Sequence, residues 1–80
     1  MPKVVLFSTS TCSWCRGAKR YFRERRIPFK EINIEHDPDA ARDIVRKTGQ
    51  TGVPVIKIGS AWIVGFDRDR IERELARKAS

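Results

Sequence analysis

The stretch Cys12-Ser13-Trp14-Cys15 lies between an apolar run, Val4–Phe7, and a segment with helical periodicity that begins near Ser13. These two cysteines are the only ones in the chain. A C-x-x-C pair between a strand and a helix places its first sulfur at the helix N-terminus, where unpaired N–H groups and the helix dipole stabilise negative charge. The second sulfur lies one turn further on. The pattern predicts a thiolate nucleophile and a resolving thiol.

The length of the chain, 80 residues, predicts one domain, residues 1–80. A Cys12–Cys15 disulfide would close a very small ring, so it would stabilise the fold little, and chemistry is the better reason for it. No segment has the pattern of a signal peptide or the length of a transmembrane helix. The expected location is therefore a reducing cytoplasm, where a C-x-x-C is redox-active or binds metal.

The first half of the chain alternates strand and helix patterns. Residues 3–8 are apolar enough for a strand that is buried on both faces. Residues 13–26 form a helical pattern, which we expect Pro28 to end. The apolar side of that helix holds Trp14, Ala18, Tyr21 and Phe22. Residues 29–34 have strand composition. The buried candidates of that strand are Phe29, Ile32 and Ile34.

The second half predicts a helix followed by a hairpin. The helix extends from Asp37 as N-cap, with Pro38 at its first position, to Gly49 as C-cap. The apolar stripe of this helix is Ala41, Ile44 and Val45. Residues 55–58 and 61–64 are strands on either side of a two-residue turn of hairpin type, Gly59-Ser60.

Asp67 or Asp69 caps a last helix, whose core positions are Ile71 and Leu75. The resulting order is β-α-β-α-β-β-α. The first two strands are joined through a helix, so they should be parallel with a right-handed crossover, whereas the last two form an antiparallel hairpin. The patterns predict an α/β protein with one four-stranded mixed sheet and helices on both faces.

Three motifs follow one another along the chain: Phe7-Ser8 before the C-x-x-C, then Thr51-Gly52-Val53-Pro54, then Val64-Gly65-Phe66-Asp67. In order and spacing they resemble the glutaredoxin-like proteins, most closely the small bacterial and archaeal members that include the NrdH-type redoxins. The resemblance covers nearly the whole chain. It implies a thioredoxin-like (glutaredoxin) fold and a small dithiol thiol–disulfide oxidoreductase, an electron carrier that reduces protein or mixed disulfides.

The resemblance also implies roles for single residues. Cys12 is the expected nucleophile and Cys15 the resolving cysteine, and together they form the redox-active disulfide. Pro54 is the expected cis proline facing that disulfide, so the backbone edge at Val53 can pair with an extended substrate. The other expected substrate-binding residues are Thr11, Trp14, Arg16, Gly65, Phe66 and Asp67. Among these, Arg16 is the basic residue closest in sequence to Cys12, and Trp14 is expected to be partly exposed for contact with a partner.

Two positions depart from the pattern of glutathione-using relatives. Thr9 stands where these relatives commonly have a basic residue, and residues 64–68 keep one Gly and one acid instead of Gly-Gly and an acidic pair. Asp67 could still meet the amino end of a glutathione moiety, but the departures weigh against specific glutathione binding. Phe66 makes the site more apolar, which suits a protein partner. The reductant stays open between glutathione and a thioredoxin-reductase-type system.

Other functions compete with this interpretation. In a monothiol, glutathione-dependent deglutathionylation, Cys15 would be dispensable. A zinc site needs four ligands, whereas the chain offers two cysteines and His36, although an Fe–S cluster bridged between two chains stays open. The net charge of +7 and the basic first helix suggest nucleic-acid binding, but the aromatic residues do not interleave with that basic stripe.

The expected partners follow from the resemblance. They are disulfide-containing protein substrates, such as ribonucleotide reductase or a similar protein, and a reductase or glutathione. We expect a monomer with no bound cofactor and no metal, and neither a membrane nor a nucleic acid as a partner.

Overall fold

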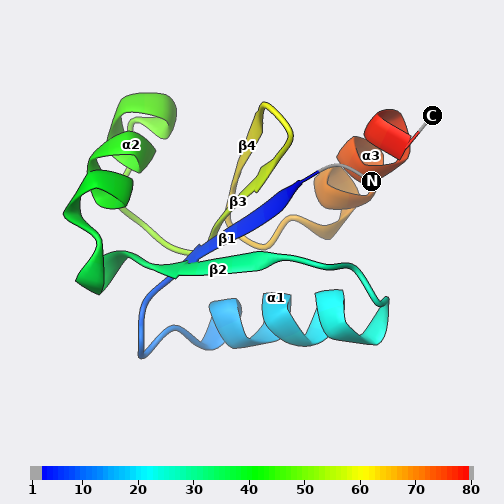
Figure 1. Cartoon of the computed structure of the whole chain (residues 1–80), viewed down its shortest axis with the longest axis horizontal. Helices are drawn as coiled ribbons and strands as arrows, with labels where there is room; N and C mark the ends of the chain where they lie inside the picture. The colour runs from blue at the N-terminus through cyan, green and yellow to red at the C-terminus, as the bar shows by residue number, and fades with distance from the viewer. Residues whose placement is uncertain (1–2, 80) are drawn as a thin grey trace.

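The computed structural model describes the backbone of residues 3–79 and the side chains of residues 3–77. Its elements are β1 (Val4–Ser8), α1 (Ser13–Glu24), β2 (Lys30–Asn33), the short 3-10 helix η1 (Ile34–His36), α2 (Pro38–Thr48), β3 (Val55–Ile58), β4 (Ala61–Val64) and α3 (Arg68–Ala79). The predicted order of strands and longer helices is confirmed (Figure 1).

The four strands form one mixed sheet in the order β2-β1-β3-β4. As predicted, β1 and β2 are parallel and β3 and β4 form an antiparallel hairpin. The central pair, β1 and β3, is antiparallel, with Phe7 opposite Val55. This register brings the segment that precedes β3, which contains Val53 and Pro54, beside the end of β1. The loop with the two cysteines leaves the sheet at that same end.

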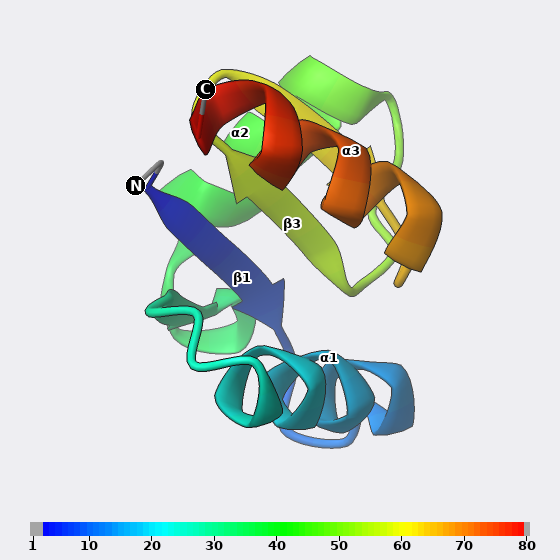
Figure 2. The same cartoon turned by 90° about the vertical axis from the view of Figure 1, so that its right-hand side faces the viewer.

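Helices cover both faces of the sheet, as predicted. On one face, α1 and α3 pack on β1, β3 and β4. The buried residues of this cluster are Val4, Leu6, Ala18, Tyr21, Phe22, Ile56, Ile58, Ile63 and Ile71. On the other face α2 packs alone, through a smaller cluster of Val5, Phe7, Ala40, Ile44 and Val55. Figure 2 shows α3 in front of β3 and α2 behind the sheet. Each large apolar side chain buried in this way contributes about 1.5–3 kcal/mol to folding.

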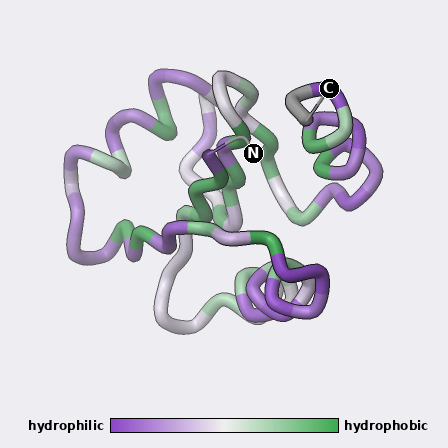
Figure 3. Tube along the Cα trace, turned by 45° about the vertical axis from the view of Figure 1, so that its right-hand side comes forward, coloured by the Kyte–Doolittle hydropathy of each residue, from purple (hydrophilic) through white to green (hydrophobic). Residues whose placement is uncertain are grey.

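The predicted caps of the helices are largely confirmed. The Asp37 carboxylate accepts the N–H of Ala40 across 3.1 Å at the start of α2, and Gly49 ends that helix with a φ of 73°. The Asp67 carboxylate accepts the N–H of Arg70 across 3.2 Å, so Asp67 rather than Asp69 caps α3. Hydrophobic residues gather at the central strands, while α1 is largely hydrophilic along its outer turns (Figure 3).

The predicted end of the first helix is wrong by two residues. Helix α1 ends at Glu24, and Arg26 has a left-handed backbone with a φ of 55°. The N–H of Ile27 then bonds the carbonyl of Phe22 across 2.8 Å, which is the hydrogen bond of a Schellman-type C-cap. This turn directs Ile27 against the larger core cluster. The helix therefore stops at its own C-cap, before Pro28 can act.

Other predicted boundaries and faces also need correction. The second strand ends at Asn33, and Ile34 instead begins η1, because the Asn33 side chain accepts the N–H of Glu35. Trp14 does not lie on the buried side of α1, since 69% of it is exposed. In α2 the buried positions are Ala40 and Ile44, while Val45 is exposed.

No helix in the described part of the chain is long and apolar enough to cross a membrane.

Candidate functional site

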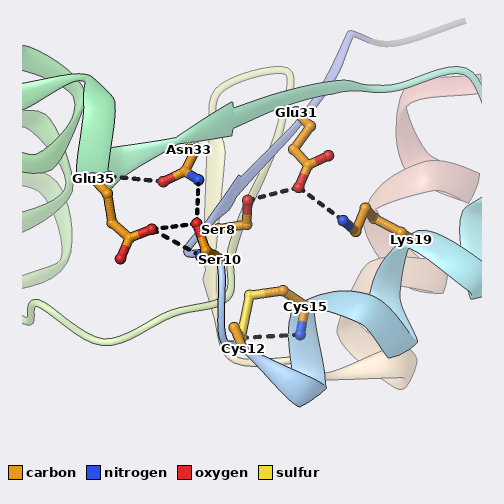
Figure 4. A network of polar contacts seen from close by, with 8 residues as sticks. All are labelled: Ser8, Ser10, Cys12, Cys15, Lys19, Glu31, Asn33 and Glu35. Carbon is orange, nitrogen blue, oxygen red and sulfur yellow. Dashed lines mark hydrogen bonds and ion pairs between the residues drawn. A yellow bond between two sulfur atoms is a disulfide. The ribbon is translucent and has the colours of Figure 1, made fainter.

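The two cysteines lie at the N-terminus of α1 and form a disulfide, with their Cα atoms 5.2 Å apart. Cys12 is the N-cap residue, and its sulfur accepts the backbone N–H of Cys15 across 3.1 Å (Figure 4). Cys12 is half-buried, whereas only 1% of Cys15 is exposed. A substrate can therefore reach the sulfur of Cys12 more readily than that of Cys15.

The start of α1 favours negative charge on the sulfur that caps it. The first turn of the helix contains no acidic residue, and the N–H groups of Cys15 and Arg16 point back toward Cys12. The guanidinium of Arg16 donates to the hydroxyl of Ser13 across 3.3 Å and is exposed to solvent. The contact that the structure shows for Arg16 is thus with Ser13 rather than with a sulfur.

The loop before Cys12 is fixed by a ring of hydrogen bonds. The N–H and hydroxyl of Ser10 donate to the carboxylate of Glu35 across 2.9 and 2.6 Å, and the Asn33 amide donates to the Ser10 hydroxyl across 3.1 Å (Figure 4). The Asn33 carbonyl in turn accepts the N–H of Glu35 across 2.9 Å. The Ser10 hydroxyl and N–H, which both donate to the carboxylate, lower the pKa of Glu35. Thr11, which follows in the loop, is exposed.

A second network connects the end of β1 to β2 and α1. Ser8 is buried, and its hydroxyl donates to the carboxylate of Glu31 across 2.8 Å. The ammonium of Lys19 lies 3.0 Å from the same oxygen of Glu31 (Figure 4). The hydrogen bond from Ser8, followed by that from Lys19, lowers the pKa of Glu31 against an opposing effect of burial. Lys19 lies one helical turn after Cys15, so the network fixes this part of α1 on the sheet.

These two networks were not predicted from the sequence. The signals for them were weak: a serine that ends an apolar strand, and an acid in the middle of β2. The partners lie 23 and 25 residues apart, and only the strand register and the position of η1 bring them together.

The other two motifs meet beside the loop. The Val53–Pro54 peptide bond is cis, and Pro54 is buried. The carbonyl of Pro54 accepts the N–H of Gly65 across 2.8 Å, which connects the second motif directly to the third. Phe66 then packs edge-on against Tyr21 of α1, with ring centroids 5.5 Å apart. The structure thus joins the second motif to the third and packs Phe66 against α1, while Asp67 is exposed and caps α3.

The two cysteines and His36 are the residue types that bind metals such as zinc. Among the side chains of residues 3–77, no group of three or more His, Cys, Asp or Glu is placed as metal ligands would be.

A disulfide at the start of a helix, after a central strand of a mixed four-stranded sheet and near a cis proline, defines a small thiol–disulfide oxidoreductase of the thioredoxin-like fold. Comparison with known proteins agrees. The family model described as Glutaredoxin matches residues 4–63, so the chain belongs to the glutaredoxin family.

Individual relatives extend this result. The chain is 34% identical over 70 residues to an uncharacterized glutaredoxin-like 8.6 kDa protein in the rubredoxin operon of Clostridium pasteurianum, covering 88% of this chain and 93% of that one. It is 36% identical over 67 residues to the glutaredoxin of Pseudomonas aeruginosa, covering 84% and 80%. Among solved structures, the glutaredoxin-like protein NrdH-redoxin from Escherichia coli superposes with a TM-score of 0.79 at 30% identity, covering 89% and 92%.

Proposed function

We propose that the chain is a dithiol electron carrier that reduces disulfides of other proteins, with Cys12 as the nucleophile and Cys15 as the resolving thiol. The observation that carries this proposal is the contrast between the two sulfurs. Cys12 is half-buried at the helix N-terminus, whereas Cys15 is almost completely buried behind it. A bulky protein disulfide can approach only the first sulfur, and the second can act only on a bond that the first has already formed.

The reaction begins from the reduced protein. The thiolate of Cys12 attacks one sulfur of the substrate disulfide, so a Cys12–substrate bond forms and the substrate S–S bond breaks. The leaving thiolate takes a proton from solvent. Cys15 then loses its proton and attacks the Cys12 sulfur, which releases the second substrate thiol. Two electrons pass to the substrate, which ends as two thiols, while the protein ends with the Cys12–Cys15 disulfide.

The surroundings of Cys12 support each step. The N–H of Cys15 and the helix dipole stabilise a negative sulfur at the N-cap position. The hydrogen bonds of Ser10 fix the preceding loop. We propose that the exposed ring of Trp14, the half-buried Phe66 and the backbone edge of Val53 contact the substrate. Trp14 directly precedes Cys15, Phe66 lies beside Gly17 of the same helix, and the strand register brings the Val53 segment to the end of β1.

We further propose that a thioredoxin-type reductase, rather than glutathione, restores the dithiol. Thr9 provides no cation for a glutathione carboxylate, and the Asp67 carboxylate already accepts a helix N–H. The NrdH-redoxin from Escherichia coli has a thioredoxin-like activity profile. This proposal places the chain in a reducing compartment such as the cytoplasm, where its disulfide forms transiently during turnover.

The experiment follows insulin reduction in the presence of dithiothreitol. Cys12→Ser should abolish the reaction, and Cys15→Ser should accumulate a mixed disulfide that mass spectrometry detects on Cys12. Ser60→Ala, an exposed position in the hairpin turn, is the control and should keep the full rate. Full activity of the Cys12→Ser variant would show that the assigned nucleophile is wrong.

The reductant is tested by oxidising the protein and offering two systems separately. One is thioredoxin reductase with NADPH, and the other is glutathione with glutathione reductase and NADPH. Faster recovery of the dithiol with thioredoxin reductase supports the proposal. Faster recovery with glutathione, together with a Cys15→Ser variant that keeps its activity, would indicate the monothiol route instead.

A further inference from the structure

A groove with a basic rim lies between α1 and the start of α3, and its lining begins at Gly17, two residues after Cys15. We call it the arginine groove. It is lined by residues of α1 and its C-cap and by two residues before and at the start of α3: Gly17, Arg20, Tyr21, Glu24, Arg25, Phe66 and Arg68. It encloses about 530 Å³ and is open to solvent on one side. This volume is within the range of sites that bind small ligands or short segments of a partner.

The floor of the arginine groove is aromatic. The rings of Tyr21 and Phe66 meet edge to face, with centroids 5.5 Å apart and planes at 73°. Gly17 has no side chain to cover them, and a Cβ built there would lie 3.8 Å from the ring of Phe66. The absence of a side chain at Gly17 therefore keeps the end of the groove near the disulfide open.

Cations surround this floor. The guanidinium carbon of Arg25 lies 4.5 Å from the centroid of the Tyr21 ring, and that of Arg68 lies 5.3 Å from it. Two guanidinium groups thus lie close to a single ring. Their positive charges repel each other unless a negative charge lies nearby. Arg20 adds a third cation to the lining.

The carboxylates of the chain neutralise these cations only in part. Glu72 lies 3.4 Å from Arg25 and also accepts the hydroxyl of Tyr21 across 3.0 Å. Glu24 lies 3.2 Å from Arg20, but the two side chains are 69% and 83% exposed, so that pair is weak and easily replaced. Within the described residues, Arg68 has no carboxylate partner. The groove therefore has an excess of positive charge that a ligand can neutralise.

The position of the groove connects it to the disulfide chemistry. Gly17 follows Cys15 by two residues in α1, and Phe66 follows Gly65, whose N–H bonds the carbonyl of Pro54. At 1.5 Å per residue, the helix carries Arg20 roughly 12 Å and Arg25 roughly 20 Å from Cys12. An extended chain covers these distances in about four to six residues at roughly 3.3 Å each.

We propose that the arginine groove binds an acidic segment of the protein whose disulfide is reduced, about four to six residues from the cysteine that Cys12 attacks. This inference rests on the function proposed above and adds a preference among substrates. Carboxylate side chains suit the site because guanidinium groups bind them through paired hydrogen bonds. The net charge of +7 would attract such a substrate over a longer distance.

Single-stranded nucleic acid would also bring negative charge, but it fits the groove less well. In proteins that bind single-stranded nucleic acids, the bases stack on exposed aromatic faces. Only 8% of Tyr21 is exposed, and two guanidinium groups already lie over its ring. The glutamates on the rim would also face the phosphates. An acidic peptide needs only the guanidinium groups and can displace Glu24 from Arg20.

The test compares peptides that share one disulfide-closed loop and differ in a tail. Residues about four to six positions from the disulfide are all Glu, all Gln or all Lys. The reduced protein is mixed with an equimolar amount of each peptide. The second-order rate constant for reduction of the peptide disulfide is measured in about 20 mM and about 500 mM salt. We expect the Glu peptide to react about tenfold faster than the Gln peptide at low salt, the Lys peptide more slowly still, and the differences to shrink at high salt.

Two double variants locate the effect. Arg20→Gln/Arg68→Gln should reduce the Glu-to-Gln rate ratio to about twofold or less. Arg42→Gln/Arg46→Gln removes the same charge from α2, on the opposite face of the sheet, and should keep most of the ratio. An equal loss of the ratio in both variants would overturn the proposal, since net charge rather than the groove would then explain the preference.

The remaining outcomes separate this inference from the function on which it rests. If the wild-type protein opens none of the peptides, the proposed function fails. If it opens all of them at the same rate at low salt, only the arginine groove proposal fails. Tight binding of a single-stranded oligonucleotide, lost in Arg20→Gln/Arg68→Gln and retained in Arg42→Gln/Arg46→Gln, would identify nucleic acid as the ligand and overturn the choice of an acidic peptide.

Discussion

The buried hydroxyl of Ser8 donates a hydrogen bond to the carboxylate of Glu31 across 2.8 Å, and Lys19 approaches the same oxygen from α1. Three elements thus meet at one carboxylate, immediately below the turn of α1 that carries Cys15. The cysteine loop follows the C-terminal end of the central strand β1, and this strand ends on the polar Ser8 after four apolar residues. At this point α1 is held to the sheet by the polar contacts of Glu31 with Ser8 and Lys19.

The first prediction concerns this attachment. Ser8→Ala removes one donor but leaves Glu31 paired with Lys19 and partly hydrated, so no charge becomes isolated. We expect the free energy of unfolding to fall by about 0.5–1.5 kcal/mol and the pKa of Glu31 to rise toward its ordinary value. Urea denaturation and an NMR titration of the carboxyl group measure the two effects. Ser60→Ala, on the exposed hairpin turn, should leave both quantities unchanged.

The second prediction is the pH dependence that Glu31 confers. Because its pKa is lowered in the folded protein, the ionised carboxylate favours folding at neutral pH, and this contribution is lost as the pH falls through the folded pKa. The side chain is 35% exposed, so solvent screening limits the contribution to below about 1 kcal/mol. Glu31→Gln should therefore be less stable than wild type at about pH 7, and the difference should vanish at about pH 2.

Urea denaturation at the two pH values provides the measurement. Glu24→Gln, on the exposed side of α1, is the control and should change the stability at pH 7 by less than about 0.5 kcal/mol. A Glu31→Gln variant as stable as wild type at neutral pH would contradict the role assigned to this carboxylate.

The third prediction concerns the loop before Cys12. Glu35→Ala removes the acceptor of both the N–H and the hydroxyl of Ser10. We expect the amide of Ser10 to exchange with solvent deuterium several-fold faster, because local opening of the loop then breaks fewer bonds. Asp43→Ala, whose carboxylate lies 3.2 Å from Arg46 on the exposed side of α2, should leave that exchange rate unchanged. Unchanged exchange in Glu35→Ala would show that the ring of hydrogen bonds does not hold the loop.

Much of the fold was predictable because its signals are local. The order of elements follows from periodicity, from Asp37 and Gly49 as caps and from the Gly59-Ser60 turn. The end of α1 was missed because its C-cap uses Arg26 in a left-handed conformation, where a glycine would have been an obvious signal. Trp14 was expected to be partly exposed, but its place on the apolar side of α1 was wrong, and the exposure of Val45 was missed. A helical stripe several residues wide does not specify which of its edges the sheet covers.

In the site, too, the features with local signals were predictable, whereas those that depend on distant residues were not. Cys12 and Cys15 stand out because their spacing is itself the motif, and the position of Pro54 follows from its motif as well. The networks of Ser8 and Ser10 depend on partners far along the chain, so the strand register and the position of η1 had to be known first. The arginine groove likewise needs the contact between Tyr21 of α1 and Phe66, which precedes α3, and this contact exists only in the folded protein.

The last prediction concerns Gly17, which could be required for close packing or merely tolerated at a cost in helix stability. A Cβ built at this position would lie 3.8 Å from the ring of Phe66, which is an ordinary contact distance, and no positive φ is involved. Gly17→Ala should therefore raise the free energy of unfolding by about 0.5–1 kcal/mol, because alanine loses less backbone entropy in a helix than glycine does. Urea denaturation measures this gain. The contrasting variant is Gly49→Ala, which forces a side chain into a φ of 73° and should lower the stability instead. A loss of stability in Gly17→Ala would mean that α1 and Phe66 require a closer approach than this distance implies.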